Sequence, residues 1–248
     1  MYMKIALLIP STSHKRDWKS FEDTYLYKHT IKTFLITYNK EHTYKFYIGI
    51  DRGDKIYDNL EIKNKIMRVV SIMQNVELEF YYMDNVNKGH LTVMWNILYD
   101  KALDDGYDYF FQCGDDIEFL TQNWVNECIS TLQCRNNIGL TGPINNNPRI
   151  LTQSFVSRKH KDMFGYYFPP EIINWFCDDW INDVYKNIGY FFPLNNHKCD
   201  NVGGQPRYEI NNDETFIKNM KENCIKTKGH CNEIVKRDIN KILTNIKN

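Results

Sequence analysis

The sequence predicts an α/β protein whose mostly parallel central sheet is covered by helices on both faces. Two observations predict this class. Through the first half of the chain, short apolar runs alternate with longer segments whose apolar residues recur at helical spacing. The fourth run, residues 107–119, starts as a nearly continuous apolar and aromatic stretch. Such a stretch is typical of a strand buried on both faces of a parallel sheet.

The elements of the first half alternate between strand and helix, and this alternation predicts parallel strands joined by crossover helices. Strands are expected at residues 4–9, 44–50, 76–83 and within 107–119, and helices at 21–38, 60–73, 91–103 and 123–132. The second half is more irregular. There we expect a strand at 151–156, helices at 179–187, 214–226 and 232–246, and a long loop at 191–207.

Composition limits the classes of function. The 248 residues carry no net charge and the pI is about 7.0, which argues against a general binder of nucleic acid or of membrane surfaces. No apolar run is long enough to span a bilayer. Seven cysteines without a CxxC pair indicate free thiols, so a cytoplasmic location is expected. With no linker or repeat, residues 1–248 are expected to form one domain.

The run at 107–119 ends in polar residues: Gly114, two adjacent carboxylates at Asp115 and Asp116, and Glu118 just beyond. In open α/β sheets, ligands bind beyond the carboxyl ends of the strands. Carboxylates placed there can hold a hard divalent cation against a phosphate. Gly-Asp-Asp is also ordinary turn chemistry, so the residues alone leave both interpretations open.

Several short motifs surround this acidic strand end in a fixed order. They are Ile9-Pro10-Ser11-Thr12, Ile50-Asp51, Asn87-Lys88-Gly89, Asn96, and Gly106-Tyr107-Asp108-Tyr109. The ordered set resembles that of glycosyltransferases of the GT-A fold, notably the inverting family 2, over roughly the first 140 residues. That family usually has acids at the first and third positions of a DxD motif. Here Gly114 stands at the first position if Asp116 is the third.

The resemblance implies a Rossmann-like GT-A fold that transfers a sugar, with inversion, from a nucleoside-diphosphate sugar to a hydroxyl of a glycan or protein. Residues 1–142 would bind the UDP- or GDP-linked donor, and residues 143–248 would face the acceptor. The implied donor contacts are Pro10, Ser11, Thr12, Asp51, Lys88, Asp115 and Arg207. A Mn²⁺ or Mg²⁺ ion would be held by Asp116 with Asp115 nearby, or by Asp116 with Glu118, and His197 could complete the site.

An inverting transfer also needs a base to take a proton from the acceptor hydroxyl. The resemblance points to the acid pair Asp178-Asp179, with Asp179 as the expected base and Asp178 as its neighbour. The same pair could instead cap a helix and stabilise its first turn. Trp175 and Trp180 could stack on a sugar ring or pack in the core. His160, between lysines, is expected on a solvated helix face.

Two other functions remain compatible with this fold. A sugar nucleotidyltransferase would carry a glycine-rich basic loop after the first strand. Residues 11–16 are basic but contain no glycine, which disfavours it. A non-catalytic module that binds nucleotide sugars is the other, and the imperfect DxD motif supports it. The sequence does not determine the donor, the acceptor or the oligomeric state.

Overall fold

The computed structural model describes residues 2–204, 207 and 232–243. Eight strands form one sheet in the order β3-β2-β1-β4-β7-β6-β8-β5. The strands are β1 (Lys4–Ser11), β2 (Thr43–Ile50), β3 (Val76–Tyr82), β4 (Tyr109–Gln112), β5 (Ile117–Phe119), β6 (Leu140–Ile144), β7 (Ser154–Ser157) and β8 (Phe191–Asn201). The helices include α1 (Lys32–Thr37), α2 (Leu60–Val70), α3 (Leu91–Asp104), α4 (Trp124–Gln133), α5 (Lys159–Phe164) and α6 (Cys177–Asn187).

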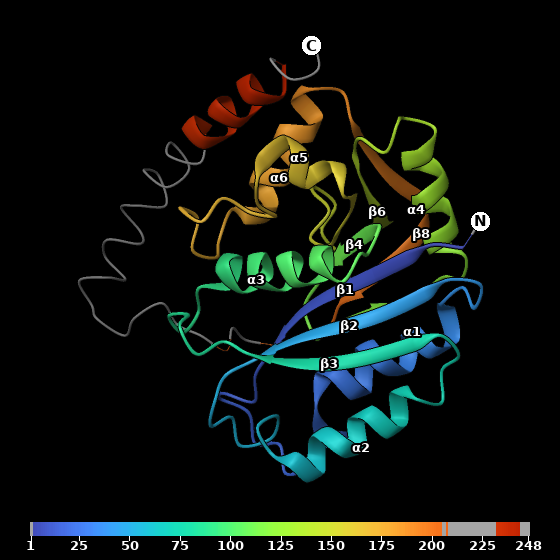
Figure 1. Cartoon of the computed structure of the whole chain (residues 1–248), viewed down its shortest axis with the longest axis vertical. Coiled ribbons are helices and arrows are strands. Elements are labelled where there is room, and N and C mark those ends of the chain that lie inside the picture. Colours follow the sequence, from blue (N-terminus) through green and yellow to red (C-terminus); the bar gives the residue numbers. More distant parts are fainter. Residues whose placement is uncertain (1, 205–206, 208–231, 244–248) are drawn as a thin grey trace.

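The first half has the expected parallel architecture. Strand β1 pairs in parallel with both β2 and β4, and β2 pairs in parallel with β3. The expected helix at 21–38 is composite: a 3₁₀ turn at Phe21–Asp23 and a π-helical turn at Leu26–Ile31 precede α1. Figure 1 shows α1 and α2 on one side of β1–β3 and α3 on the other. The predicted sheet with helices on both faces is confirmed.

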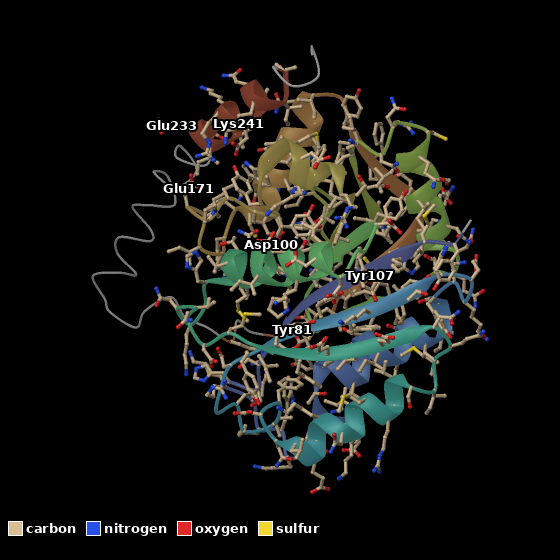
Figure 2. All side chains as sticks on the ribbon, in the orientation of Figure 1. Tyr81, Asp100, Tyr107, Glu171, Glu233 and Lys241 are labelled. Atoms are coloured by element: carbon tan, nitrogen blue, oxygen red, sulfur yellow. The ribbon has the colours of Figure 1, made fainter. Side chains whose placement is uncertain are left out.

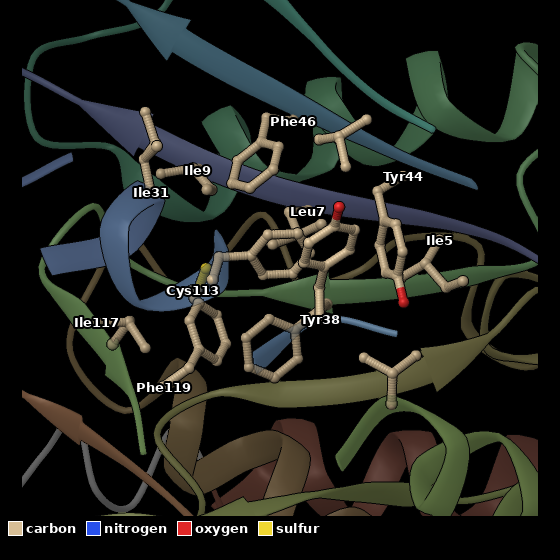
Figure 3. Packing of buried hydrophobic residues seen from close by; sticks show 14 of the residues in the cluster. Ile5, Leu7, Ile9, Ile31, Tyr38, Tyr44, Phe46, Cys113, Ile117 and Phe119 are labelled. Atoms are coloured by element: carbon tan, nitrogen blue, oxygen red, sulfur yellow. The ribbon is translucent and has the colours of Figure 1, made fainter. Parts of the chain in front are cut away.

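The two faces of the sheet have separate cores because side chains alternate along a strand. Ile5, Leu7 and Ile9 of β1 pack with residues of α1, α2 and α4, whereas Ala6 and Leu8 pack with α3, α5 and α6. Figure 3 shows the first core, in which Ile5, Leu7 and Ile9 lie near Tyr44 and Phe46 of β2. Burial of each large apolar side chain stabilises the fold by roughly 1.5–3 kcal/mol. The two cores therefore hold the strand ends of the sheet in place.

The second half departs from expectation in two strands. The predicted loop at 191–207 is wrong for its first part, because Phe191–Asn201 forms β8. This strand pairs in parallel with β6 and antiparallel with β5. Strand β6 was not expected, since it contains Gly142 and Pro143. Pairing with neighbours stabilises both strands although neither has a clear apolar alternation.

The run at residues 107–119 forms two separate strands instead of one. Strand β4 ends at Gln112, and the chain leaves its row in the sheet before pairing again as β5 with β8. The loop between them carries Asp115 and Asp116 at the carboxyl end of β4. The fold therefore places both acids where open α/β sheets bind ligands.

Residues 232–243 are helical, within the expected 232–246, whereas the helix expected at 214–226 lies outside the described residues. Figure 2 shows Glu171 beside this last helix, which carries Glu233 and Lys241. Arg237 pairs with Glu171 at 2.5 Å, and the buried Asp238 accepts a hydrogen bond from the Trp180 indole at 3.1 Å. Among the described residues, no helix is both long and apolar enough to cross a membrane.

His160 corrects another expectation. Instead of lying on a solvated helix face, it is buried and hydrogen-bonded to the Tyr185 hydroxyl at 2.8 Å and the Tyr167 carbonyl at 2.9 Å. Burial lowers the pKa of His160 to about 4, so the ring is neutral. It is a core residue that links α5 to α6.

Candidate functional site

A cavity of about 350 Å³, called the main cavity below, opens at the carboxyl ends of β1 and β4. Two further elements, α3 and the start of α6, contribute to its wall. Its lining includes Pro10, Ser11, Thr12, Leu91, Met94, Trp95, Gln112, Gly114, Asp115, Asp116, Thr152, Gln153, Asn174, Trp175, Asp178, Asn201 and Arg207. The fold thus gathers most of the residues that the sequence singled out into one place.

Asp115 is fully buried, and Arg207 engages both of its carboxylate oxygens. The guanidinium Nη1 lies 2.7 Å from Asp115 Oδ2 and also donates to the Thr12 carbonyl at 3.3 Å. Burial acts to lower the pKa of Arg207, but the charges of Asp115 and Asp116 outweigh it and raise that pKa. The arginine therefore stays charged, and Asp115 serves to position it.

Asp116 lies beside this ion pair, with Oδ2 3.7 Å from the Arg207 guanidinium. Two glycines enclose its carboxylate. A Cβ on Gly203 would lie 1.7 Å from Asp116 Oδ2, and one on Gly114 would lie 2.4 Å from Oδ1. Burial, and then the charge of Asp115, raise the pKa of Asp116. Its negative charge is incompletely compensated, and the glycines leave the carboxylate room that any side chain would fill.

The lining of the main cavity has the chemistry that a divalent cation fits, although not with the expected ligand set. Among the described residues, this lining carries the carboxylates of Asp115, Asp116 and Asp178 and the guanidinium of Arg207. A hard cation takes oxygen ligands and is often held by one or two carboxylates together with substrate phosphates. Within the described residues, no three His, Cys, Asp or Glu side chains form a metal cluster. Asp116 is thus the protein ligand that the geometry offers.

The structure separates His197 from the two acids. Its ring bonds Glu127 Oε2 at 2.7 Å and Thr121 Oγ1 at 3.2 Å, and it is mostly buried there. It lies on β8 four residues before Asn201, which pairs with Ile117, so the two sites are roughly 13 Å apart along the strand. The expectation that His197 completes a metal site with Asp116 does not agree with this placement.

The second acid pair stands at the start of α6, which begins at Cys177, two residues before the expected start. Asp178 lines the main cavity, and burial followed by the charge of Asp179 raises its pKa to about 7. Asp179 instead binds Arg149 at 2.5 Å. A carboxylate that faces a cavity with a pKa near neutrality is suited to act as a base, so the placement favours Asp178 over Asp179.

The residue just before this helix has a strained backbone conformation. Phe176 has φ 74°, a left-handed conformation that bulky side chains rarely adopt and that costs on the order of 1–3 kcal/mol. Its ring packs against the core on the α3 side of the sheet, while the preceding Trp175 is more than half exposed beside the main cavity. This conformation turns the chain sharply between Trp175 and Asp178, two residues that line the main cavity.

A second hollow of about 290 Å³, called the side cavity below, adjoins the first. It is lined by Asp51 and Lys88, both expected donor contacts, and it shares Thr12 with the main cavity. Asp54, which the sequence analysis did not single out, joins the two strand ends. It accepts hydrogen bonds from Thr12 Oγ1 at 3.0 Å and from the Ser13 amide and hydroxyl at 2.7 Å.

Asp54 and Arg149 were missed in the sequence analysis. A local sequence pattern could have identified the first of them but not the second. Asp54 closes the Asp51-Arg52-Gly53-Asp54 stretch after β2. An aspartate that accepts hydrogen bonds from the backbone amides of the next residues is a known turn pattern, and here the amides of Ile56 and Tyr57 donate to Asp54. Arg149 lies 30 positions from its partner Asp179 in an irregular loop. No local pattern points to that pairing.

Comparison with known proteins supports the fold. No protein-family model matches the sequence, and no curated protein matches it. Among solved structures it is similar to S. aureus TarS, with TM-score 0.54 at 12% identity, over 79% of this chain and 36% of that one. TarS 1–349 in complex with UDP-GlcNAc gives TM-score 0.54 at 12% identity, over 98% of this chain and 73% of that one. The complex with UDP gives TM-score 0.51 at 13% identity, over 80% and 60%.

The chain therefore spans about a third of the length of the longer TarS chain and 60% of the TarS 1–349 chain in its complex with UDP. Similarity at this level of identity bears on the fold. It confirms the expected Rossmann-like GT-A fold, which this chain shares with TarS.

Proposed function

We propose that this protein is a glycosyltransferase that moves a sugar from a UDP-linked donor to a hydroxyl acceptor. One observation carries the proposal: the acidic loop with its arginine and the carboxylate of Asp178 line the same cavity at the carboxyl ends of β1 and β4. The solved complexes of TarS 1–349 with UDP and with UDP-GlcNAc, which share the fold, support a UDP-linked donor.

The donor would extend across the two adjoining cavities. Asp51 and Lys88 of the side cavity would contact the nucleoside, and Thr12, which lines both, would lie near the start of the diphosphate. Pro10 and Ser11 continue the wall into the main cavity. There Arg207, held by Asp115, would present a fixed positive charge that attracts the phosphate oxygens.

A divalent cation, Mn²⁺ or Mg²⁺, would be held by Asp116 together with donor phosphate oxygens. When bound it would neutralise the negative charge that develops on the departing diphosphate. The charges of the described lining residues support this part of the proposal, since the carboxylates of Asp115, Asp116 and Asp178 outnumber the guanidinium of Arg207 and would otherwise repel a diphosphate. Arg207, which pairs with Asp115 and lies 3.7 Å from Asp116, would help to hold the Asp116 carboxylate next to the donor.

Asp178 would act as the base. The acceptor hydroxyl oxygen forms a bond to the anomeric carbon as the bond from that carbon to the diphosphate oxygen breaks. The bonding electrons leave with UDP, and the hydroxyl proton passes to the Asp178 carboxylate. A single displacement of this kind inverts the anomeric centre. General-base help of this type is typically worth about 10²–10⁴-fold in rate.

Release of UDP from UDP-GlcNAc in the presence of Mn²⁺ tests the proposal. The wild type is expected to release UDP, Asp116→Ala to lose most of that turnover, and Asp100→Asn, an exposed acid on α3, to match the wild type. Equal turnover by Asp116→Ala would remove the role of Asp116. Thermal stabilisation by UDP without turnover would indicate a binding module, and pyrophosphate release from UTP and a sugar phosphate would indicate a nucleotidyltransferase.

A further inference from the structure

One wall of the main cavity has no part in the donor chemistry described above. It is formed by Leu91, Met94 and Trp95 of α3 and by Trp175 just before α6. Trp95 and Met94 are buried in the core beneath, whereas the Trp175 side chain is 56% exposed. A large aromatic surface is thus left accessible to solvent at a cavity that otherwise carries carboxylates and neutral polar groups.

The exposure of Trp175 is built into the backbone. The Cys177 amide donates to the Asn174 carbonyl at 3.4 Å, which closes a tight turn, and Phe176 inside that turn has φ 74°. Phe176 takes the core position and leaves its neighbour outside. Trp180 shows the alternative use of an indole in the same segment, since it is fully buried and hydrogen-bonded to Asp238. The chain therefore holds one tryptophan out of the core beside Asp178.

The polar groups near Trp175 indicate which kind of ligand could stack on its indole ring. Asn174, Thr152 and Gln153 line the same cavity and offer neutral donors and acceptors. Within the described lining, the positive charge comes from Arg207, and Asp115 already pairs with it, while Asp116 and Asp178 add negative charge. An acceptor with a phosphate or carboxylate group near Asp178 would meet repulsion there, whereas an uncharged one would not.

We propose that Trp175 is the platform on which the acceptor stacks, and that the acceptor is an uncharged saccharide. The apolar C–H face of a sugar ring packs on the exposed indole, and its hydroxyls meet Asn174 and the Asp178 carboxylate. This assignment rests on the proposed glycosyl transfer, and it narrows the acceptor from any hydroxyl compound to a neutral glycan. It makes Trp175 an acceptor-binding residue that does not touch the reacting atoms.

The test combines saccharide binding with donor turnover on the full chain. Binding of neutral trisaccharides (cellotriose, chitotriose and maltotriose) is measured by calorimetry with UDP and Mn²⁺ present, beside trigalacturonate and a serine-rich peptide. Water-dependent release of UDP from UDP-GlcNAc is measured on the same samples. The variants are Trp175→Ala, Trp175→Phe and the matched control Ile173→Ala, an exposed apolar side chain two residues away that is absent from the cavity lining.

We expect at least one neutral trisaccharide to bind, with about tenfold weaker binding to Trp175→Ala and near-normal binding to Trp175→Phe and Ile173→Ala. UDP release should be unchanged in the control Ile173→Ala. The proposal is overturned if Trp175→Ala binds as the wild type does, if trigalacturonate or the peptide binds as tightly, or if no neutral trisaccharide binds while UDP is released. Loss of UDP release in Trp175→Ala would place Trp175 in the donor site and also overturn it. Saccharide binding through Trp175 without any UDP release would instead count against the glycosyl transfer alone.

Discussion

The two aspartate pairs, Asp115-Asp116 and Asp178-Asp179, share one arrangement and differ in the burial of their ion pairs. In each pair one acid binds an arginine, Asp115 with Arg207 and Asp179 with Arg149. In each pair the other acid lines the cavity with a raised pKa, as Asp116 and Asp178 do. The first ion pair is 0% and 14% exposed at its acid and arginine, whereas the second is 23% and 66% exposed.

This difference in burial gives the two ion pairs different effects on stability and on the neighbouring acid. A buried ion pair leaves a strongly unfavourable charge when one partner is removed, while an exposed pair contributes little because water solvates each partner alone. The Asp115 pair therefore fixes the position of the Arg207 guanidinium at the main cavity. In the more exposed pair, the charge of Asp179 still acts on its neighbour and contributes to the raised pKa of Asp178.

The largest effect is expected from Asp178→Asn. It should lower glycosyl transfer by about 10²–10⁴-fold, because the amide cannot take the hydroxyl proton. It should also stabilise the fold above neutral pH. Burial raises the pKa of Asp178 to about 7, so the folded state prefers the protonated acid, and stability is lost as pH rises from the ordinary carboxyl range through 7.

Thermal melts at pH 5 and pH 8 check the second part. The asparagine stays neutral, so its advantage should be about 1–2 kcal/mol at pH 8 and smaller at pH 5. That range is below the full value of the shift because Asp178 borders an open cavity. Unchanged transfer, or an equal gain at both pH values, would contradict the role given to Asp178.

Comparison of Arg207→Met with Arg149→Met measures the two ion pairs directly. The first substitution leaves Asp115 buried without its partner and should cost about 3–5 kcal/mol of unfolding free energy. The second should cost less than about 1 kcal/mol, because Asp179 keeps contact with water. Urea unfolding followed by circular dichroism gives both values. Similar losses would mean that burial does not distinguish the pairs.

The sequence predicted the half of the fold whose signal is local. Apolar runs such as residues 4–9 and 44–50 identify buried strands whatever surrounds them, and both became central strands. Strand β8 could not be found this way, because its Asn-Asn-His-Lys stretch has no apolar alternation. Pairing with β5 and β6, which are distant in sequence, makes it a strand.

The prediction of the site was likewise limited to features with a local signal. The type and order of residues singled out Asp115, Asp116 and the acid pair of α6, and the structure brings Asp115, Asp116 and Asp178 to one cavity. The partner of each acid depends on long-range packing, so sequence could not show that Arg207 occupies both oxygens of Asp115 or that Asp179 turns to Arg149. For the same reason it could not separate His197 from Asp116 or tell exposed Trp175 from buried Trp180.

Gly203→Ala tests the space around Asp116. The added Cβ would lie 1.7 Å from Asp116 Oδ2, so the carboxylate or the backbone must move. UDP release with Mn²⁺ should fall about tenfold and the Mn²⁺ concentration for half-maximal rate should rise, with a stability cost of about 1–3 kcal/mol. Gly204→Ala is the matched control, since its Cβ would meet the Tyr25 hydroxyl at an ordinary 3.6 Å. Equal behaviour of both variants would remove the steric argument.

The smallest expected effect concerns the charge of Asp179. That charge is the second cause, after burial, of the raised pKa of Asp178. In Asp179→Asn the Asp178 pKa should therefore fall, and the rising limb of the pH–rate profile, expected near pH 7 in the wild type, should move to lower pH by about half a unit. The maximal rate should change little, because Asp179 binds Arg149 and not the substrate. A profile measured with UDP-GlcNAc between pH 5 and 9 decides this, and a lost maximal rate would instead return the role of base to Asp179.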